Sequence, residues 1–231
     1  MRFVSYPEAQ ALEKAPGYDG LLGAWPSFLL HDRISNRYWS RLYTDFPAFQ
    51  FLVLDDDRVV AEGNTVPVHG QPATWRDAFV NAWEGDGTVD RLCALAIVVV
   101  PDRRRSGLSA HLIAHMRELA APFGSLVAPV RPTLKERYPL IPIDDYAGWR
   151  RPDGAAVDPW IRRHERSGGR ILGTAEEAML IEGSREEWEA WTELAFPGDG
   201  DYVVPGALEP VRFAGGHGVY REPCVWIEHR A

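Results

Sequence analysis

Three consecutive arginines stand in a turn between a hydrophobic segment and a helical segment. Residues 95–109 read LAIVVVPDRRRSGLS, and a helical run continues through 110–121. Gly107 allows the backbone to approach a ligand closely, and the first N–H groups of a helix have no partners of their own. The positive end of the helix dipole and the arginine side chains both attract negative charge. The pattern therefore predicts a phosphate site directly after a buried strand.

This turn resembles the coenzyme A-binding motif of the GNAT N-acetyltransferases. Their motif reads Arg/Gln-x-x-Gly-x-Gly/Ala and follows a strand that ends in Val-x-Pro. Here Arg104, Gly107 and Ser109 occupy the motif positions, after the sequence Val-Val-Pro at 99–101. The final position is Ser instead of Gly or Ala. One glycine is too few for a dinucleotide fingerprint, and the chain contains no Gly-Lys-Ser/Thr of a P-loop.

The resemblance implies that acetyl-CoA or coenzyme A binds as a co-substrate and that no metal takes part. It implies contacts from the loop and the first helical turn to the pyrophosphate, and from one strand residue to the pantetheine arm. The residues so assigned are Val99, Arg104, Arg105, Gly107, Leu108 and Ser109.

A second fragment suggests a proton donor for the departing thiolate. Members of the family often end the next helix with Tyr-x-x-x-Gly-Phe, and His164-Glu-Arg-Ser-Gly-Gly stands at the equivalent place. His164 therefore replaces a tyrosine that often acts as the acid, and a histidine with a pKa near 6.5 can donate a proton near neutrality. Tyr138 and Tyr146 are rivals, because the pKa of a phenol matches that of a thiolate better.

The sequence does not identify a single general base. Some relatives carry a glutamate near the position of Cys93, and a thiol is a poor base there. Asp90 and Glu62 are substitutes, and a water-mediated proton path is the other alternative. His111 and His115 have metal-ligand spacing on one helix, but the zinc-protease pattern needs a glutamate where residue 112 is leucine. Both histidines are expected to face solvent.

Hydrophobic patterning predicts the elements that position these residues. The strand at 91–100, the helix at 107–121 and the strand at 125–130 form a βαβ unit, so the two strands should be parallel neighbours. Residues 131–157 have no clean period and read as a long irregular segment. The other predicted elements are helices at 7–15, within 25–43, at 75–83, from Asp158 to Gly168 and after a capping box at 184–187, a hairpin of 49–54 with 59–66, and strands at 170–181 and 219–229.

These elements and the resemblance together predict an α/β (α+β) fold of the GNAT kind, with a central mixed β-sheet flanked by helices. The chain of 231 residues is expected to form a single domain, 1–231. Its core covers about 45–182, interrupted by an insertion at 131–157 and followed by a C-terminal extension at 183–231.

Composition limits the partners. The formal net charge of −8 argues against nonspecific binding of nucleic acid or anionic membranes. The two cysteines provide no disulfide framework, and neither a signal peptide nor a membrane-spanning run is evident. A cytoplasmic protein is expected, as a monomer or a homodimer.

The function implied by the resemblance is transfer of an acyl group, most often acetyl, from coenzyme A to an amine of a small molecule by direct attack. Two alternatives stay open. A non-catalytic acyl-CoA-binding or sensor domain would explain why the Tyr and Phe of the second motif are replaced. The same fold could also carry other thioester chemistry, such as O-acyl transfer, carrier-protein loading or decarboxylation.

Overall fold

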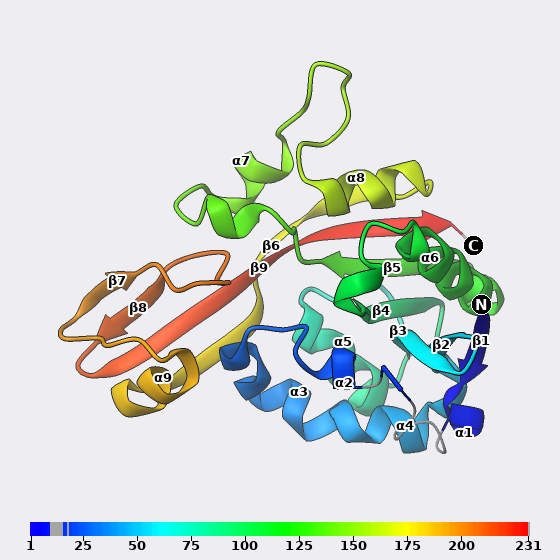
Figure 1. Cartoon of the computed structure of the whole chain (residues 1–231), viewed down its shortest axis with the longest axis horizontal. Coiled ribbons are helices and arrows are strands. Elements are labelled where there is room, and N and C mark those ends of the chain that lie inside the picture. The colour runs from blue at the N-terminus through cyan, green and yellow to red at the C-terminus, as the bar shows by residue number, and fades with distance from the viewer. Residues whose placement is uncertain (10–15, 18, 231) are drawn as a thin grey trace.

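A mixed β-sheet runs through the protein and carries helices on both of its faces (Figure 1). The computed structural model describes residues 1–9, 16–17 and 19–230. Nine strands pair in the order β1-β2-β3-β4-β5-β9-β8-β7, and β6 pairs with β9. The predicted class, a mixed sheet flanked by helices, is confirmed.

The first half of the sheet is antiparallel. The predicted hairpin is confirmed, with a turn at Asp56 in the left-handed region (φ 53°) between its two strands. The four strands are β1 (Arg2–Ser5), β2 (Gln50–Asp55), β3 (Arg58–Val68) and β4 (Arg91–Val99).

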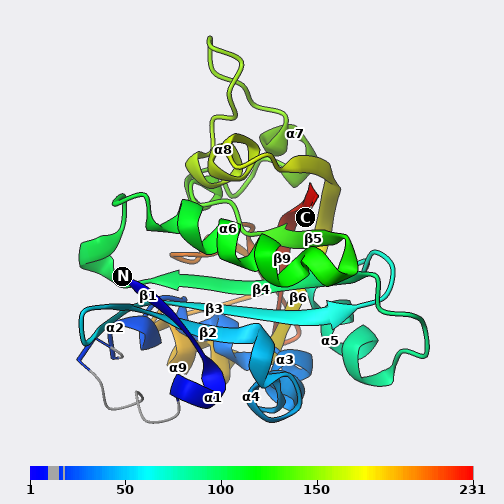
Figure 2. The same ribbon diagram turned by 90° about the vertical axis from the view of Figure 1, so that its right-hand side faces the viewer.

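The βαβ unit is also confirmed. Helix α6 (Leu108–Ala120) leads from β4 to β5 (Ser125–Val130), and β4 and β5 are parallel neighbours. The apolar stripe of α6 includes Leu112 and Met116, both fully buried against the sheet. Burial of this stripe fixes α6 on one face of the sheet, where it lies beside α8 (Pro159–Arg166) (Figure 2).

The last strand is central, not peripheral. β9 (His217–Arg230) pairs with β5 on one side and with β6 (Arg170–Ser184) on the other. Val225 and Ile227 are completely buried. The prediction that the apolar run at 219–229 completes the sheet is therefore confirmed.

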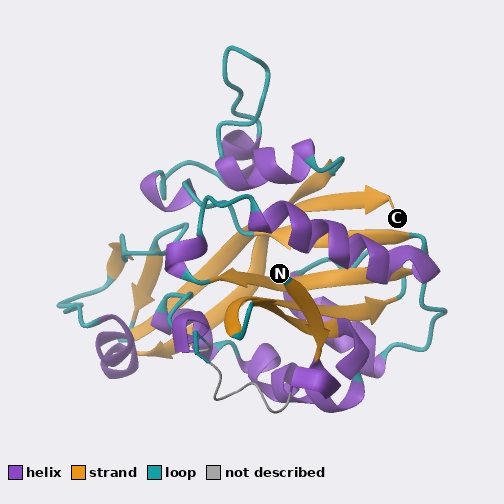
Figure 3. Ribbon diagram, turned by 45° about the vertical axis from the view of Figure 1, so that its right-hand side comes forward, coloured by secondary structure: helices purple, strands orange, loops and turns teal. Residues whose placement is uncertain are grey.

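Two regions contain more regular structure than their sequences suggest. The segment 131–157 includes η7 (Lys135–Arg137) and α7 (Ile143–Ala147) before a loop that projects from the body (Figure 3). After the predicted capping box, which is present at Ser184 and Glu187, α9 (Arg185–Thr192) leads to β7 (Gly200–Tyr202) and β8 (Val211–Ala214). The segment between α9 and β9 is therefore not a plain loop, because β8 pairs with β9.

Short helices cover the opposite face from α6 (Figures 1 and 2). Most of the helix predicted at 7–15 lies outside the described residues. The helical regions predicted within 25–43 and at 75–83 are confirmed. No helix in the described ranges is long and apolar enough to cross a bilayer. The remaining helical elements are α1 (Tyr6–Ala9), α2 (Asp19–Leu22), η2 (Ser27–His31), α3 (Arg33–Tyr38), η3 (Trp39–Arg41), α4 (Leu42–Asp45), η4 (Pro47–Phe49), α5 (Trp75–Glu84), η5 (Pro101–Arg103) and η6 (Ala121–Phe123).

Candidate functional site

The two parallel strands separate after only two residue pairs. Leu92 pairs with Leu126 and Cys93 with Val127. Beyond them, among the described residues, β4 pairs only with β3 and β5 only with β9. The edge of β4 from Ala94 onward therefore faces β5 without a strand partner. Buried backbone groups require hydrogen-bond partners, so such an open edge can receive an extended ligand that contributes them.

The arginine turn lies at the open end of this splay. Gly107 is the N-cap of α6 and has a φ of 89°, in the left-handed region that favours glycine. No side chain caps the helix at Gly107, and nothing within the described residues comes within 4 Å of the point where a Cβ would lie. The first turn of a helix and its dipole attract anions, and the open space at Gly107 leaves room for one.

The three arginines of the turn differ in their partners. Arg103 forms an ion pair with Asp55 at 2.6 Å. Arg104 is exposed, and its Nε donates to the carbonyl of Val99 at 3.4 Å. Arg105 has a left-handed backbone (φ 66°) and is exposed, with no ion pair among the described residues. Arg104 and Arg105 are therefore the ones whose charge can serve a ligand.

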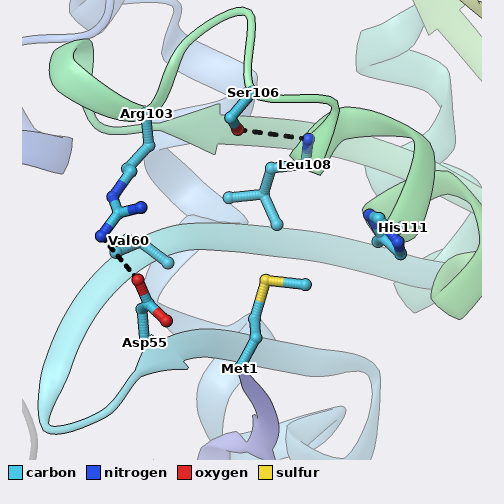
Figure 4. A pocket seen from close by; sticks show the side chains of 7 residues that line it. All are labelled: Met1, Asp55, Val60, Arg103, Ser106, Leu108 and His111. Carbon is cyan, nitrogen blue, oxygen red and sulfur yellow. Dashed lines mark hydrogen bonds and ion pairs between the residues drawn. The ribbon is translucent and has the colours of Figure 1, made fainter.

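A hollow of about 200 Å³ lies beside the turn, on its β2–β3 side (Figure 4). The Asp55–Arg103 pair forms one wall, and the hydroxyl of Ser106 accepts from the N–H of Leu108 at the rim. The hollow therefore borders the N-terminal turn of α6. Its lining residues are Met1, Asp55, Val60, Arg103, Ser106, Leu108 and His111.

His164, the first candidate for the acid, lies in the interior. It is 3% exposed, and its Nδ1 is 2.9 Å from Nε2 of His229 on β9. Burial and the neighbouring His229 lower the pKa of His164 to about 3. The expectation of a histidine that is protonated near neutrality is therefore wrong, because desolvation disfavours the charged imidazolium.

The histidine pair predicts a loss of stability in acid. Burial also lowers the pKa of His229, to about 4, whereas both histidines regain ordinary values on unfolding. The unfolded state then binds more protons below pH 6.5, so stability is complete above that pH and falls as the pH drops toward the folded values. We expect urea unfolding to show a loss on the order of 2–4 kcal/mol between pH 7 and pH 5.

The matched control is His217, which is exposed at the start of β9. His164→Phe combined with His229→Leu should flatten the pH dependence, and His217→Gln should leave it unchanged. A double variant that still loses as much stability as the wild type between pH 7 and pH 5 would place the acid sensitivity elsewhere.

The two tyrosines differ sharply in environment. Tyr146 is 2% exposed, and its hydroxyl donates to Asp158 at 2.9 Å. Burial, together with the carboxylate of Asp158, raises the pKa of Tyr146 above its ordinary value. Asp158 is the N-cap of α8 and accepts hydrogen bonds from two backbone N–H groups there. The hydrogen bond from Tyr146 therefore connects α7 to the start of α8. Tyr138 is 42% exposed and is the accessible phenol of the two.

The candidate bases are not equivalent either. Cys93 is fully buried, and burial raises the pKa of its thiol. The carboxylate of Asp90 accepts from the N–H of Gly70 at 2.7 Å, at an exposed position. Glu62 lies on β3 and pairs with Val98 at the edge of β4 away from β5, and its carboxylate accepts from the hydroxyl of Tyr43 at 2.7 Å. Of these groups, Glu62 lies on the strand that pairs with the splayed part of β4.

His115 was expected to face solvent, but it packs against aromatic side chains. Its ring packs between Phe3 at 4.3 Å and Phe51 at 4.6 Å, measured between ring centroids. The α6 face beside the buried stripe is covered by β1 and β2, and the sequence of the helix alone does not contain that neighbour. His111 is exposed, at the rim of the hollow.

The sequence pattern did not predict that residues 73–75 cross the gap between β4 and β5. The indole N–H of Trp75 donates to the carbonyl of Leu95 on β4 at 3.0 Å. The indole N–H of Trp226 on β9 donates to the carbonyl of Ala73 at 3.2 Å. Because β5 lies between β4 and β9, residues 73–75 span the sheet face at β5. The Thr74–Asp77 capping box could have marked the helix start, but not this contact.

Comparison with known proteins adds one related sequence with a known activity. A scan of protein-family models finds no match. The chain is similar to the arginine N-acetyltransferase avaD of Aspergillus versicolor, with 32% identity over 246 residues that cover 89% of this chain and 84% of the relative.

Two solved structures share the fold. The loading GNATL domain of CurA from Lyngbya majuscula has a TM-score of 0.64 and 15% identity, and the similarity covers 99% of this chain and 96% of that domain. The GNAT-like decarboxylase GphF, solved in complex with isobutyryl-CoA, has a TM-score of 0.61 and 18% identity, with 99% and 97% of the two chains covered.

Proposed function

Since this chain belongs to the GNAT superfamily of N-acetyltransferases, we propose that its splayed strands hold acetyl-CoA while an amine attacks the thioester directly. The observation that carries this proposal is the separation of β4 from β5 after Cys93 and Val127, with an open anion site at its wide end. The bound thioester supplies an activated carbonyl. The amine nitrogen forms a bond to that carbonyl carbon, the C–S bond breaks, and the thiolate takes up a proton.

We assign the coenzyme contacts to the residues named by the motif. The pyrophosphate is assigned to the N–H of Ser109 and to that of Leu108, which here donates to Ser106 at 3.4 Å, and Gly107 allows its close approach. Arg104 and Arg105 supply mobile positive charge. The carbonyl of Val99, to which Arg104 donates here, is available to the pantetheine arm once that side chain turns to phosphate.

We assign proton transfer to Tyr138 and Glu62, neither of which is fully buried. Tyr138 is the proposed donor to the thiolate, since His164 and Tyr146 are buried and hydrogen-bonded to structural partners. Glu62, on β3 beside the part of β4 that has no β5 partner, is the proposed acceptor of the ammonium proton through water.

The acceptor that we propose is an amino acid with a basic side chain. Support comes from the related enzyme, which is named for N-acetylation of arginine and aligns over most of both chains. We further propose that the whole chain acts as one catalytic unit on a small molecule, without nucleic acid or membrane, as a monomer or homodimer in the cytoplasm.

The test is turnover of acetyl-CoA with L-arginine, followed by release of free thiol and by the mass of the product. We expect one acetylated arginine for each coenzyme A released, and Tyr138→Phe should lower kcat without weakening coenzyme binding. Coenzyme binding without turnover of arginine or any other amine would favour a non-catalytic acyl-CoA-binding or sensor domain. Turnover with a carrier protein or loss of CO₂ from an acyl-CoA, in place of amine acetylation, would favour the other thioester chemistries.

A further inference from the structure

We propose that Arg76 binds the carboxylate of the acceptor, so that the enzyme selects amines that carry a free carboxylate. This inference rests on the proposed transfer to an amino acid. It concerns the face of the sheet opposite α6 and α8, where an acceptor would approach a thioester held in the splay.

The position of Arg76 follows from its neighbours. Trp75 is anchored to Leu95, two residues after the last pair between β4 and β5. Ala73 is anchored to Trp226. Arg76 therefore continues a segment that crosses the splay, and its side chain reaches toward β6.

A bulge in β6 supplies the present partner of Arg76. Ala175 pairs with Cys224 and Met179 with Glu222, so residues 176–178 of β6 lie opposite a single residue of β9. Bulges redirect side chains and are frequent next to active sites. This one carries Glu177, whose carboxylate accepts from Nη2 of Arg76 at 2.6 Å and from Nε of Arg221 at 2.9 Å.

The guanidinium of Arg76 is only partly satisfied. Its Nε is buried and has no hydrogen-bond partner among the described residues, although its Nη2 is paired with Glu177. An arginine edge offers two parallel N–H groups that match a carboxylate, and a buried donor without an acceptor is costly. A carboxylate placed on this edge would satisfy both donors.

Glu177 can yield its place to such a ligand. Its side chain is 35% exposed, and that of Arg76 is 22% exposed. The carboxylate of Glu177 thus occupies the place where the carboxylate of the acceptor would bind. The two carboxylates compete for Arg76. An amino acid fits this arrangement, whereas an amine without a carboxylate gains nothing from Arg76.

The experiment compares L-arginine with L-argininamide, which lacks the carboxylate, in the acetyl-CoA assay. Arg76→Gln and Glu177→Gln break the same ion pair, so a structural role would make both variants change in the same direction. We expect Arg76→Gln to raise the KM for L-arginine at least about 10-fold and to change that for L-argininamide little. Glu177→Gln should instead lower the KM for L-arginine, because the competing carboxylate is gone.

The outcomes separate the two proposals. A wild type that acetylates neither compound nor any other amine overturns the proposed function. A wild type that uses both compounds with equal KM, or two variants that both raise the KM for L-arginine, overturns the assignment of Arg76 and leaves acetyl transfer intact. Unchanged affinity for coenzyme A in both variants shows that the coenzyme site is unaffected.

Discussion

Gly107→Glu is expected to weaken coenzyme A binding by at least about 100-fold, or about 2.7 kcal/mol. Gly107 combines a left-handed backbone, an open approach and the N-terminal end of α6. A glutamate there places a negative charge where the pyrophosphate would lie, and a side chain in that backbone conformation is strained by about 1–2 kcal/mol. Calorimetric titration with coenzyme A measures the loss.

The matched control is Gly107→Asn, since asparagine tolerates the left-handed region and adds no charge. It should retain most of the affinity and the full thermal stability. Raising the salt concentration should weaken binding to the wild type, because the contact is electrostatic. If the Gly107→Glu variant binds coenzyme A as tightly as the wild type, the arginine turn is not part of the coenzyme site.

Arg131→Met is expected to destabilise the protein by about 3–5 kcal/mol. Arg131 follows β5 and pairs with Glu222, a carboxylate that is 2% exposed in the middle of β9. Burial raises the pKa of Glu222, and Arg131 opposes that shift. Without the arginine, a charge or an added proton would have to be accommodated in the interior, and the carbonyl of Gly206 would also lose its donor.

Urea unfolding at neutral pH measures this loss. The double variant Arg131→Met with Glu222→Gln removes the charge but keeps a hydrogen-bonding group next to the hydroxyl of Tyr220. It should recover at least half of the lost stability. A cost below about 1 kcal/mol for Arg131→Met, or a double variant that is no more stable than the single one, would show that the pair is not a buried charge pair in solution.

Local patterns in the sequence were sufficient to predict most elements. The run before Pro101 is continuously apolar and rich in β-branched residues, and the apolar stripe of α6 is periodic, so their secondary structure follows from their own residues. The same holds for the capping box at Ser184 and Glu187. The turn at Gly107 was also predictable, because the anion site is built from backbone that one short segment provides.

The roles of single side chains did not follow in the same way. His164 occupies the predicted place on α8, but its pKa depends on its burial and on His229, 65 residues further along the chain. Tyr146 could not be distinguished from Tyr138 until Asp158 was seen to hold its hydroxyl. A pKa is set by desolvation and by neighbouring charges, and these come from distant segments.

By itself, then, the sequence determined the strand, turn and helix of the proposed coenzyme site, since those depend on contacts within a few residues. Only the tertiary structure decided where the unpaired edge of β4 begins, how 73–76 crosses it, and that Arg76 meets Glu177 at a distance of 101 residues. The physical reason is that strand pairing and buried ion pairs join distant segments, and their formation depends on how the whole core packs.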